Sequence, residues 1–226
     1  MTALRYDVLG IGNAIVDVLA RADDDFLVAH GMNKGSMALI DEDRATKIYA
    51  AMGPAVEISG GSAANTIVGV AGFGARAAFV GKVRDDDLGR IFGHDIRAAK
   101  VGFDTRPATS GPSTARSYIL VTPDGERTMN TYLGAAQDLQ SVDIDTETVA
   151  ASAITYMEGY LWDPPQAKEA FLKAAKAAHG AGRMVALTLS DAFCVDRYRD
   201  EFLKLLRDGV VDLLFANETE LKSLVG

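Results

Sequence analysis

Short apolar runs alternate along the chain with segments whose apolar residues recur at helical spacing. From residue 143 onward this alternation is regular. It predicts helices over 145–152, 166–179 and 195–207, strands over 154–160, 184–189 and 211–215, and a last helix that opens at Asn217. Continuous apolar strands separated by amphipathic helices are typical of a parallel sheet with helices on both faces. The sequence therefore predicts an α/β fold with a mostly parallel central sheet.

The first half of the chain fits this pattern with one exception. Strands are predicted over 6–12, 37–40 and 76–83, and helices over 42–52, with Asp41 as N-cap, and over 85–100. The exception is a pair of β-like runs, 114–122 and 127–133, joined by Pro-Asp-Gly-Glu, which is a strong hairpin signal. This hairpin carries Arg116 and Arg127 among Thr, Ser and Asn residues. We expect an exposed sheet such as a flap or lid.

A strand–turn–helix junction over residues 58–66 contains two adjacent glycines, Gly60 and Gly61. Paired glycines let the backbone bend sharply or approach a ligand closely. The helix that follows begins near Ser62 and Asn65, and a helix start offers free N–H groups. Taken alone, the junction fits a tight turn before a core helix as well as it fits a binding site for a polar small molecule.

Asp17 interrupts the apolar run 15–19, and a carboxylate on a core strand is costly unless it meets a partner or ligand hydroxyls. The alternative is that strand alternation points Asp17 to solvent. A dinucleotide fingerprint at Gly10 and Gly12 is not supported, because its third glycine position is Ile15. Polar residues gather at the predicted carboxyl ends of strands, where parallel sheets bind ligands: Asn13, Asp17, Gly60, Gly61, Asn65, Ser190, Asp191, Asn217 and Glu220.

The net charge of −8 over 226 residues argues against a nucleic-acid or anionic-membrane surface. The single cysteine, Cys194, favours a reducing compartment and an inert, partly buried thiol at a helix start. No apolar run is long enough to span a membrane, so a cytoplasmic protein is expected. The three histidines lack metal-ligand spacing, and the acidic run 85–87 fits helix capping better than a metal site.

Four motifs, in order and across essentially the whole chain, resemble the ribokinase-like (PfkB) carbohydrate and nucleoside kinase family. They are Gly-Asn-Ala-Ile-Val-Asp at 12–17, Gly-Gly-Ser-Ala-Ala-Asn at 60–65, Gly-Lys-Val-Arg-Asp-Asp-Asp-Leu-Gly at 81–89 and Asn-Glu-Thr-Glu at 217–220. The first two are most similar to adenosine-kinase-like members, since Ser62 stands where ribokinase typically has Lys.

The resemblance implies a ribokinase-like three-layer α/β/α domain over 1–226, with lid strands from about 13–40 and 114–133. It implies that Asp17 binds the ribose hydroxyls of a small-molecule nucleoside or sugar, since a carboxylate accepts two hydrogen bonds from a vicinal diol. Asn65 and the backbone of Gly60 and Gly61 would contact the same sugar, with the glycines also forming the lid hinge. Asn13 would orient Asp17 or touch the substrate, and Arg116 would point from the lid toward the site. A homodimer through the lid is a further expectation.

The resemblance also implies that Asn217 and Glu220 organise the Mg²⁺ hydration shell and the phosphates of ATP, with no direct metal ligand in this chain. A spacing of three places both side chains on one helical face, and a plain N-cap is the alternative for Asn217.

The resemblance places the catalytic base in a Gly-Ala-Gly-Asp motif, which this sequence lacks. No catalytic residue is therefore assigned within the chain, and the base, an aspartate, is expected downstream of Gly226. The last predicted helix is short, so a truncated chain that turns over little or no substrate is expected.

These observations predict ATP-dependent phosphorylation of the 5′-hydroxyl of adenosine or a related ribosyl compound. A ribokinase-type or other sugar kinase is the alternative within the same class. A non-catalytic nucleoside or sugar sensor is the alternative from another class, because the catalytic base is missing.

Overall fold

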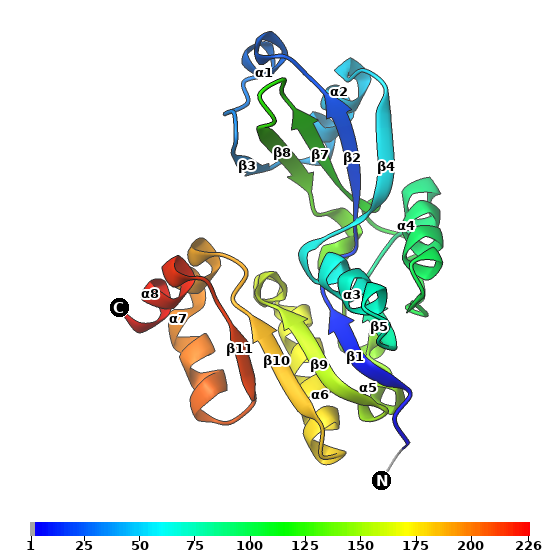
Figure 1. The fold of residues 1–226 in the computed structure, drawn as a ribbon, viewed down its shortest axis with the longest axis vertical. Coiled ribbons are helices and arrows are strands. Elements are labelled where there is room, and N and C mark those ends of the chain that lie inside the picture. Colours follow the sequence, from blue (N-terminus) through cyan, green and yellow to red (C-terminus); the bar gives the residue numbers. More distant parts are fainter. Residues whose placement is uncertain (1–2) are drawn as a thin grey trace.

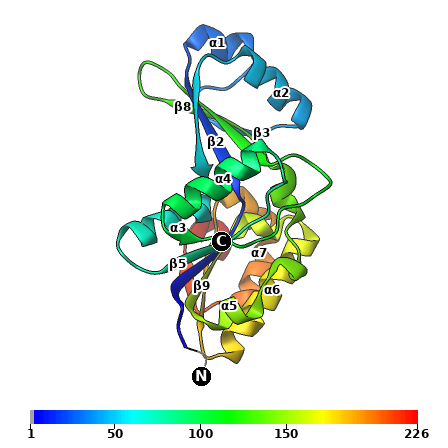
Figure 2. The same cartoon turned by 90° about the vertical axis from the view of Figure 1, so that its right-hand side faces the viewer.

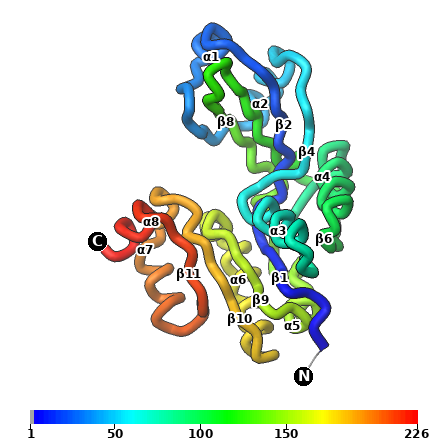
Figure 3. The backbone as a smooth tube through the Cα atoms, viewed as in Figure 1, coloured from blue at the N-terminus to red at the C-terminus, as the bar shows by residue number. Residues whose placement is uncertain are grey.

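The computed structural model describes residues 3–226, which form two β-sheets joined by four passages of the chain. Figure 1 and Figure 3 show the chain passing from β1 to β2, back from β4 into α3, up again to β7 and back after β8. The positions of the predicted site residues follow from this arrangement.

The larger sheet has six strands, and all of its pairings are parallel. In spatial order the strands are β11 (Leu213–Phe215), β10 (Met184–Thr188), β9 (Ser152–Glu158), β1 (Tyr6–Ile11), β5 (Ala77–Val80) and β6 (Val101–Gly102). Most strands are short and apolar because helices cover them. The predicted mostly parallel central sheet is confirmed.

Helices lie on both faces of this sheet, as Figure 2 shows. Leu9 of β1 packs with Phe171 and Val195 in one core, whereas Gly10, which points to the other face, lies against Ile67. One face is covered by α5 (Thr146–Ala150), α6 (Pro165–Gly180) and α7 (Ala192–Arg207), the other by α3 (Ser62–Gly72) and α4 (Asp87–Ala98), and α8 (Glu218–Val225) packs on α7. The result is the predicted three-layer α/β/α domain.

The smaller sheet, here called the lid, has the strand order β3-β8-β7-β2-β4. Its strands are β2 (Ile15–Arg21), β3 (Met37–Leu39), β4 (Ala55–Gly60), β7 (Ala115–Val121) and β8 (Arg127–Tyr132), with α1 (Asp24–Ala29) and α2 (Glu42–Ala51) beside them. The predicted hairpin is the antiparallel pair β7 and β8. The predicted lid segments omitted β4, which pairs with β2 from Gly60 to Ala55 and so belongs to the lid.

Aspartates cap most of the longer helices, as the sequence indicated. Asp41 accepts a hydrogen bond from the Arg44 amide at 2.8 Å at the start of α2, and Asp86 accepts one from the Gly89 amide at 2.8 Å at the start of α4. Such caps satisfy amides that have no partner within the helix. The predicted strand 154–160 instead ends at Glu158, and residues Gly159–Trp162 form a 3₁₀ turn.

Cys194 is buried in the first turn of α7, and its Sγ donates to the Gly159 carbonyl at 3.3 Å. Burial raises the pKa of this thiol to about 12, with the nearby carboxylates of Asp163 and Asp191 acting in the same direction. The thiol therefore stays protonated and unreactive near neutral pH. This agrees with the expected inert cysteine.

Candidate active site

A cavity of about 510 Å³ lies between the lid and the carboxyl edge of the large sheet. Asn13, Asp17, Gly61 and Asn65, all predicted from the sequence, line it. Strand ends and a strand–helix turn bring them together, since Asn13 follows β1, Asp17 lies on β2 and Gly61 precedes α3. The carboxyl edge of a parallel sheet is where ligands bind in open α/β folds.

Asp17 faces the cavity and not bulk solvent. Its neighbours Val16 and Val18 are fully buried on the opposite side of β2, so alternation directs Asp17 toward the cavity. Burial raises the pKa of Asp17 from its ordinary 3.8 to about 6. A partly desolvated carboxylate of this kind gains from hydroxyl donors on a ligand.

Gly60 leaves the space that the Asp17 carboxylate occupies. A methyl group added at Gly60 would lie between 2.2 and 2.7 Å from the carboxylate atoms of Asp17. Gly61, the N-cap of α3, has a φ of 103°, and a side chain there would come within 2.4 Å of the Asn13 backbone oxygen. Both glycines are therefore required by close approach, and Gly61 also by its left-handed backbone.

Glu158, at the end of β9, is a buried cavity residue that the sequence analysis did not select. It is 1% exposed, and its Oε1 accepts hydrogen bonds from Asn13 Nδ2 at 2.6 Å and the Asn13 amide at 3.2 Å. Its Oε2 accepts a hydrogen bond from the Ala63 amide at 2.8 Å. Burial raises the pKa of Glu158, and these three donors oppose that shift.

Glu158 therefore connects the β1–β2 turn to the start of α3. The signal in the sequence was an acidic residue inside the predicted apolar strand 154–160, the same kind of interruption that selected Asp17. Which buried backbone amides needed an acceptor could be known only from the fold.

The structure does not bring Arg116 to the cavity, contrary to the expectation that it would point toward the site. Its Nε donates to the Tyr118 hydroxyl at 2.9 Å and its Nη1 to Ser113 Oγ at 2.8 Å, and it lies 4.9 Å from the centroid of the Tyr132 ring. Strand alternation is the reason, because Ser117 and Ile119 are the β7 residues that line the cavity, and Arg116 lies on the opposite face.

Arg127, the other arginine of the hairpin, lines the cavity instead. It lies on the same face of β8 as Met129 and Thr131, which also line the cavity. An exposed guanidinium here places a positive charge beside a cavity that also contains Asp17 and Glu158. The sequence singled out both arginines, but the face on which each lies depends on register.

Asn217 and Glu220 form a capping box at the start of α8. The Glu220 amide donates to Asn217 Oδ1 at 2.8 Å, and Glu220 accepts from Asn217 Nδ2 at 2.8 Å and from the Asn217 amide at 3.1 Å. Glu220 is 7% exposed, and neither residue lines the cavity. The N-cap role that was the alternative for Asn217 is confirmed.

Gly226, beyond which the catalytic base is expected, is the C-cap of α8. Its amide donates to the Lys222 carbonyl at 2.9 Å, and a methyl group added at its Cα would lie 2.8 Å from Arg199 Nη2. Gly226 does not line the cavity, so it ends the helix and is no part of the candidate site. The position of the base stays a prediction.

Among residues 3–226, no group of three or more His, Cys, Asp or Glu side chains is arranged to hold a metal ion. In the acidic run 85–87, Asp86 caps α4 while Asp85 and Asp87 pair with Arg90. The same part of the chain contains no helix that is both long and apolar enough to span a membrane.

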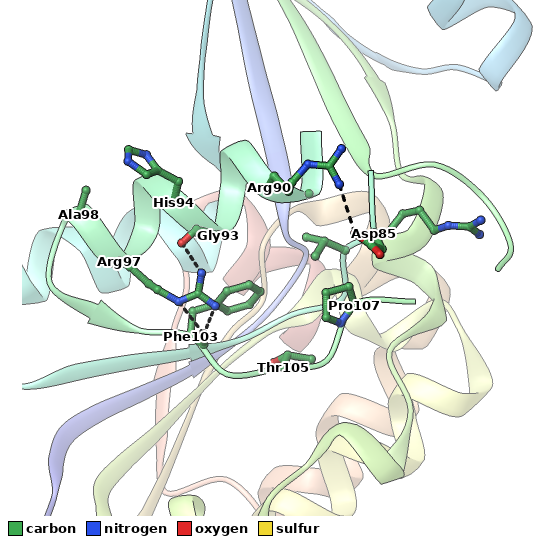
Figure 4. A pocket seen from close by; sticks show the side chains of 12 residues that line it. Asp85, Arg90, Gly93, His94, Arg97, Ala98, Phe103, Thr105 and Pro107 are labelled. Atoms are coloured by element: carbon green, nitrogen blue, oxygen red, sulfur yellow. Dashed lines mark hydrogen bonds and ion pairs between the residues drawn. The ribbon is translucent and has the colours of Figure 1, made fainter. Parts of the chain in front are cut away.

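A second cavity of about 610 Å³ runs along α4, as Figure 4 shows. Arg97 donates from one side of it to the carbonyls of Gly93 and Phe103, and Arg90 pairs with Asp85 on the other. None of the predicted site residues lines this second cavity.

A three-layer α/β/α domain with a β-lid over a polar cavity matches the small-molecule kinase class that the motifs resemble. The chain belongs to the pfkB family of carbohydrate kinases, whose sequence pattern matches residues 40–226. Two solved structures are similar over most of this chain. The adenosine kinase from Sinorhizobium meliloti is 60% identical with a TM-score of 0.89, and the match covers 97% of this chain and 67% of that one. A probable sugar kinase from Rhizobium etli CFN 42 is 56% identical with a TM-score of 0.90, covering 98% and 67%.

Curated relatives are more distant. The probable fructokinase-6, chloroplastic, of Arabidopsis thaliana is 28% identical over 168 residues, which cover 72% of this chain and 43% of that protein. The guanosine-inosine kinase of Escherichia coli strain K12 is 24% identical over 230 residues, which cover 97% and 52%. The chain thus spans about half the length of the curated relatives it matches.

Proposed function

We propose that the protein transfers a phosphoryl group from ATP to the 5′-hydroxyl of adenosine or a related ribosyl compound. The observation that carries this proposal is the convergence of Asn13, Asp17 and Asn65 on one cavity. These side chains present carboxylate and amide groups to the same small volume. A vicinal diol donates two hydrogen bonds, which one carboxylate can accept.

The rest of the cavity supports a nucleoside more than a free pentose. Leu39, Leu133 and Phe193 line it, and the Phe193 side chain is 76% exposed. Apolar and aromatic walls with a few placed polar groups are typical of sites for small organic ligands. In the proposed complex the sugar lies against Asp17 and the base against this apolar wall.

The phosphate groups would lie near Arg127 and the start of α8. Arg127 brings a positive charge from the lid, and guanidinium groups bind phosphate oxygens well. Asn217 and Glu220 are fixed by their capping box, and a carboxylate with an amide suits a Mg²⁺ ion that keeps its water ligands. Bound Mg²⁺ would neutralise phosphate charge.

Nucleoside binding is a better test of this 226-residue chain than the rate of phosphorylation. The sequence contains no Gly-Ala-Gly-Asp stretch, in which the family resemblance places the catalytic base. Phosphoryl transfer depends on positioning and on charge stabilisation around the transferred group. We therefore expect nucleoside binding with little or no phosphorylation.

Isothermal titration calorimetry with adenosine, inosine, ribose and fructose, with and without MgATP, tests the proposal. We expect adenosine or inosine to bind more tightly than either sugar, and Asp17→Ala to abolish measurable binding. Nucleoside affinity that Asp17→Ala leaves unchanged would show that the diol assignment is wrong.

A sugar kinase is the second candidate, because Asn13, Asp17 and Asn65 would hold a free sugar as well as a ribosyl group. Similarity to the probable sugar kinase from Rhizobium etli also favours it. In that case ribose or fructose binds more tightly than adenosine in the same titrations. A nucleoside sensor differs from both, since it would bind adenosine tightly and MgATP would change nothing.

We also propose a homodimer through the lid, in a reducing compartment such as the cytoplasm. Val56 and Ile58 of the lid edge strand β4 are 65% and 47% exposed. Exposed apolar side chains next to one another on an edge strand are typical of an interaction surface. Sedimentation velocity of the wild type and of Val56→Glu tests this, with a dimer expected for the wild type and a monomer for the variant.

A further inference from the structure

An ion pair between Asp163 and Arg197 lies in the wall of the cavity. The Arg197 Nη2 atom is 3.0 Å from both carboxylate oxygens of Asp163, and Nε is 3.2 Å from Oδ1. The side chains remain 49% and 31% exposed, for Arg197 and Asp163 respectively. The pair is therefore accessible to a ligand, unlike the enclosed Glu158.

The start of α6 and the second turn of α7 hold the pair in place. Asp163 directly precedes Pro164 and Pro165, which begin α6 with fixed φ angles. Arg197 lies on α7, one turn after Phe193 and therefore on the same helical face. The backbone of a residue before two prolines and that of a residue on a helix are both restricted, as a recognition site requires.

The pair retains hydrogen-bonding capacity toward the cavity. Arg197 uses Nε and Nη2 for Asp163, which leaves the two N–H groups of Nη1 outside the pair. A carboxylate can accept about four hydrogen bonds, so Asp163 can accept another. A donor and an acceptor thus stand side by side in the wall of the cavity that Phe193 also lines.

A donor beside an acceptor is the complement of the six-membered-ring edge of a purine. A 6-aminopurine presents an amine donor next to the N1 acceptor, whereas a 6-oxopurine presents the reverse order, an oxygen acceptor next to the N1–H donor. A free sugar has no such planar edge. We propose that Asp163 and Arg197 read this edge, with Asp163 accepting from the 6-amino group and Arg197 donating to N1, and that they set a preference for 6-aminopurine over 6-oxopurine nucleosides; this rests on the proposed nucleoside function.

The pair is not needed merely to hold α7 against α6. Lys168 of α6 pairs with Glu201 of α7 at 2.8 Å, and its Nζ lies 4.3 Å from the centroid of the Tyr198 ring. This second ion pair links the same two helices and does not line the cavity. Glu201→Gln is therefore a matched control for variants of the recognition pair.

Calorimetry of the 226-residue chain with nucleoside analogues tests the inference. 1-Deazaadenosine lacks the N1 acceptor, and purine riboside lacks the 6-amino group. We expect the wild type to bind each analogue about tenfold more weakly than adenosine, the change expected for a lost hydrogen bond to a charged group. Inosine should bind more weakly than adenosine by about tenfold or more, because its donor and acceptor stand in the reverse order. Arg197→Met should weaken the binding of adenosine about tenfold and leave the binding of 1-deazaadenosine unchanged. Asp163→Ala should weaken the binding of adenosine about tenfold and leave the binding of purine riboside unchanged.

The outcomes separate this inference from the function on which it rests. Glu201→Gln should keep the wild-type pattern of affinities. Equal wild-type affinity for adenosine and its two analogues, or a variant that weakens every ligand by the same factor, overturns the inference alone. A wild-type protein that binds ribose or fructose but no nucleoside overturns the proposed function and the inference with it. The wild-type comparison needs no variant to fold.

Discussion

The Cα of Gly60 lies directly against the carboxylate of Asp17. A methyl group at Gly60 would come within 2.2 Å of Oδ2 and 2.7 Å of Oδ1, much closer than any side-chain carbon can approach an oxygen. The two residues lie on neighbouring strands, β4 and β2, so lid pairing alone creates this contact. The residue that makes room for the carboxylate also ends the strand that leads into α3.

Gly60→Ala should weaken nucleoside binding about tenfold and cost about 1–3 kcal/mol of stability, because the added methyl displaces Asp17 or the lid strand. Calorimetry and urea unfolding measure the two effects. Gly69→Ala is the matched control, because no atom lies within 4 Å of the added methyl and α3 gains about 0.5–1 kcal/mol of helix propensity. Wild-type affinity in Gly60→Ala would contradict the steric argument.

Asp17 should make ligand binding depend on pH near 6. Its pKa is raised to about 6 by burial, and the ionised form is the one that accepts two hydroxyl donors. Adenosine affinity of the wild type should therefore increase about tenfold between about pH 5 and about pH 7. Titrations across this range with Asp17→Asn should give weak affinity that does not change with pH.

The same shift has the opposite effect on stability. The folded protein keeps a proton that the unfolded chain releases above its ordinary pKa of 3.8, so the contribution of Asp17 to stability is complete below that pH and is lost as the pH rises through about 6. Asp17→Asn should be more stable than the wild type by about 1–2 kcal/mol at about pH 8 and no more stable at about pH 4. The difference at about pH 8 is smaller than the full pKa shift implies, because water in the cavity screens the Asp17 charge. Urea unfolding at both pH values measures the difference.

Glu158→Gln should destabilise the turn between β1 and β2. Three N–H donors point at the Glu158 carboxylate, and the amide of Gln would place its own N–H groups against at least one of them. We expect a loss of about 1–3 kcal/mol in unfolding free energy, and faster hydrogen exchange at Asn13 and Ala63. Glu169→Gln, an exposed site on α6, should change neither.

The two arginines of the hairpin, Arg116 and Arg127, should have different functions. Arg127→Gln should weaken binding of adenosine 5′-monophosphate about tenfold while leaving adenosine unchanged, because only the phosphate gains from the charge. Arg116→Gln should leave both affinities unchanged and lower stability, because Arg116 bonds Tyr118 and Ser113 away from the cavity. Calorimetry of both ligands distinguishes the roles, and equal effects of the two variants would refute them.

Asn217 should combine a capping role with a role toward MgATP. Asn217→Ala should lower stability by about 1 kcal/mol, the usual effect of a lost N-cap. Asn217→Ser keeps a capping oxygen and adds no charge beside the buried Glu220 carboxylate, so it should remain closer to wild-type stability than Asn217→Ala yet weaken MgATP binding several-fold, because the side-chain amide is lost. If Asn217→Ser binds MgATP as the wild type does, Asn217 serves as a cap only.

The sequence by itself determined the alternating strands and helices, because apolar spacing and aspartate caps are local properties of the chain. It also selected Asp17, since a carboxylate within an apolar strand requires a reason wherever the strand lies. Gly60 and Gly61 were recognisable because adjacent glycines permit turns that other residues resist.

Tertiary structure alone decided which of these residues meet. The pairing of β4 with β2 brought Gly60 to Asp17 and made β4 a lid strand, which no local signal predicts. Strand register placed Arg127 on the cavity face and Arg116 on the other, because side chains alternate and a shift of one residue reverses them. Glu158 gained its role only when two distant turns brought their backbone amides to it.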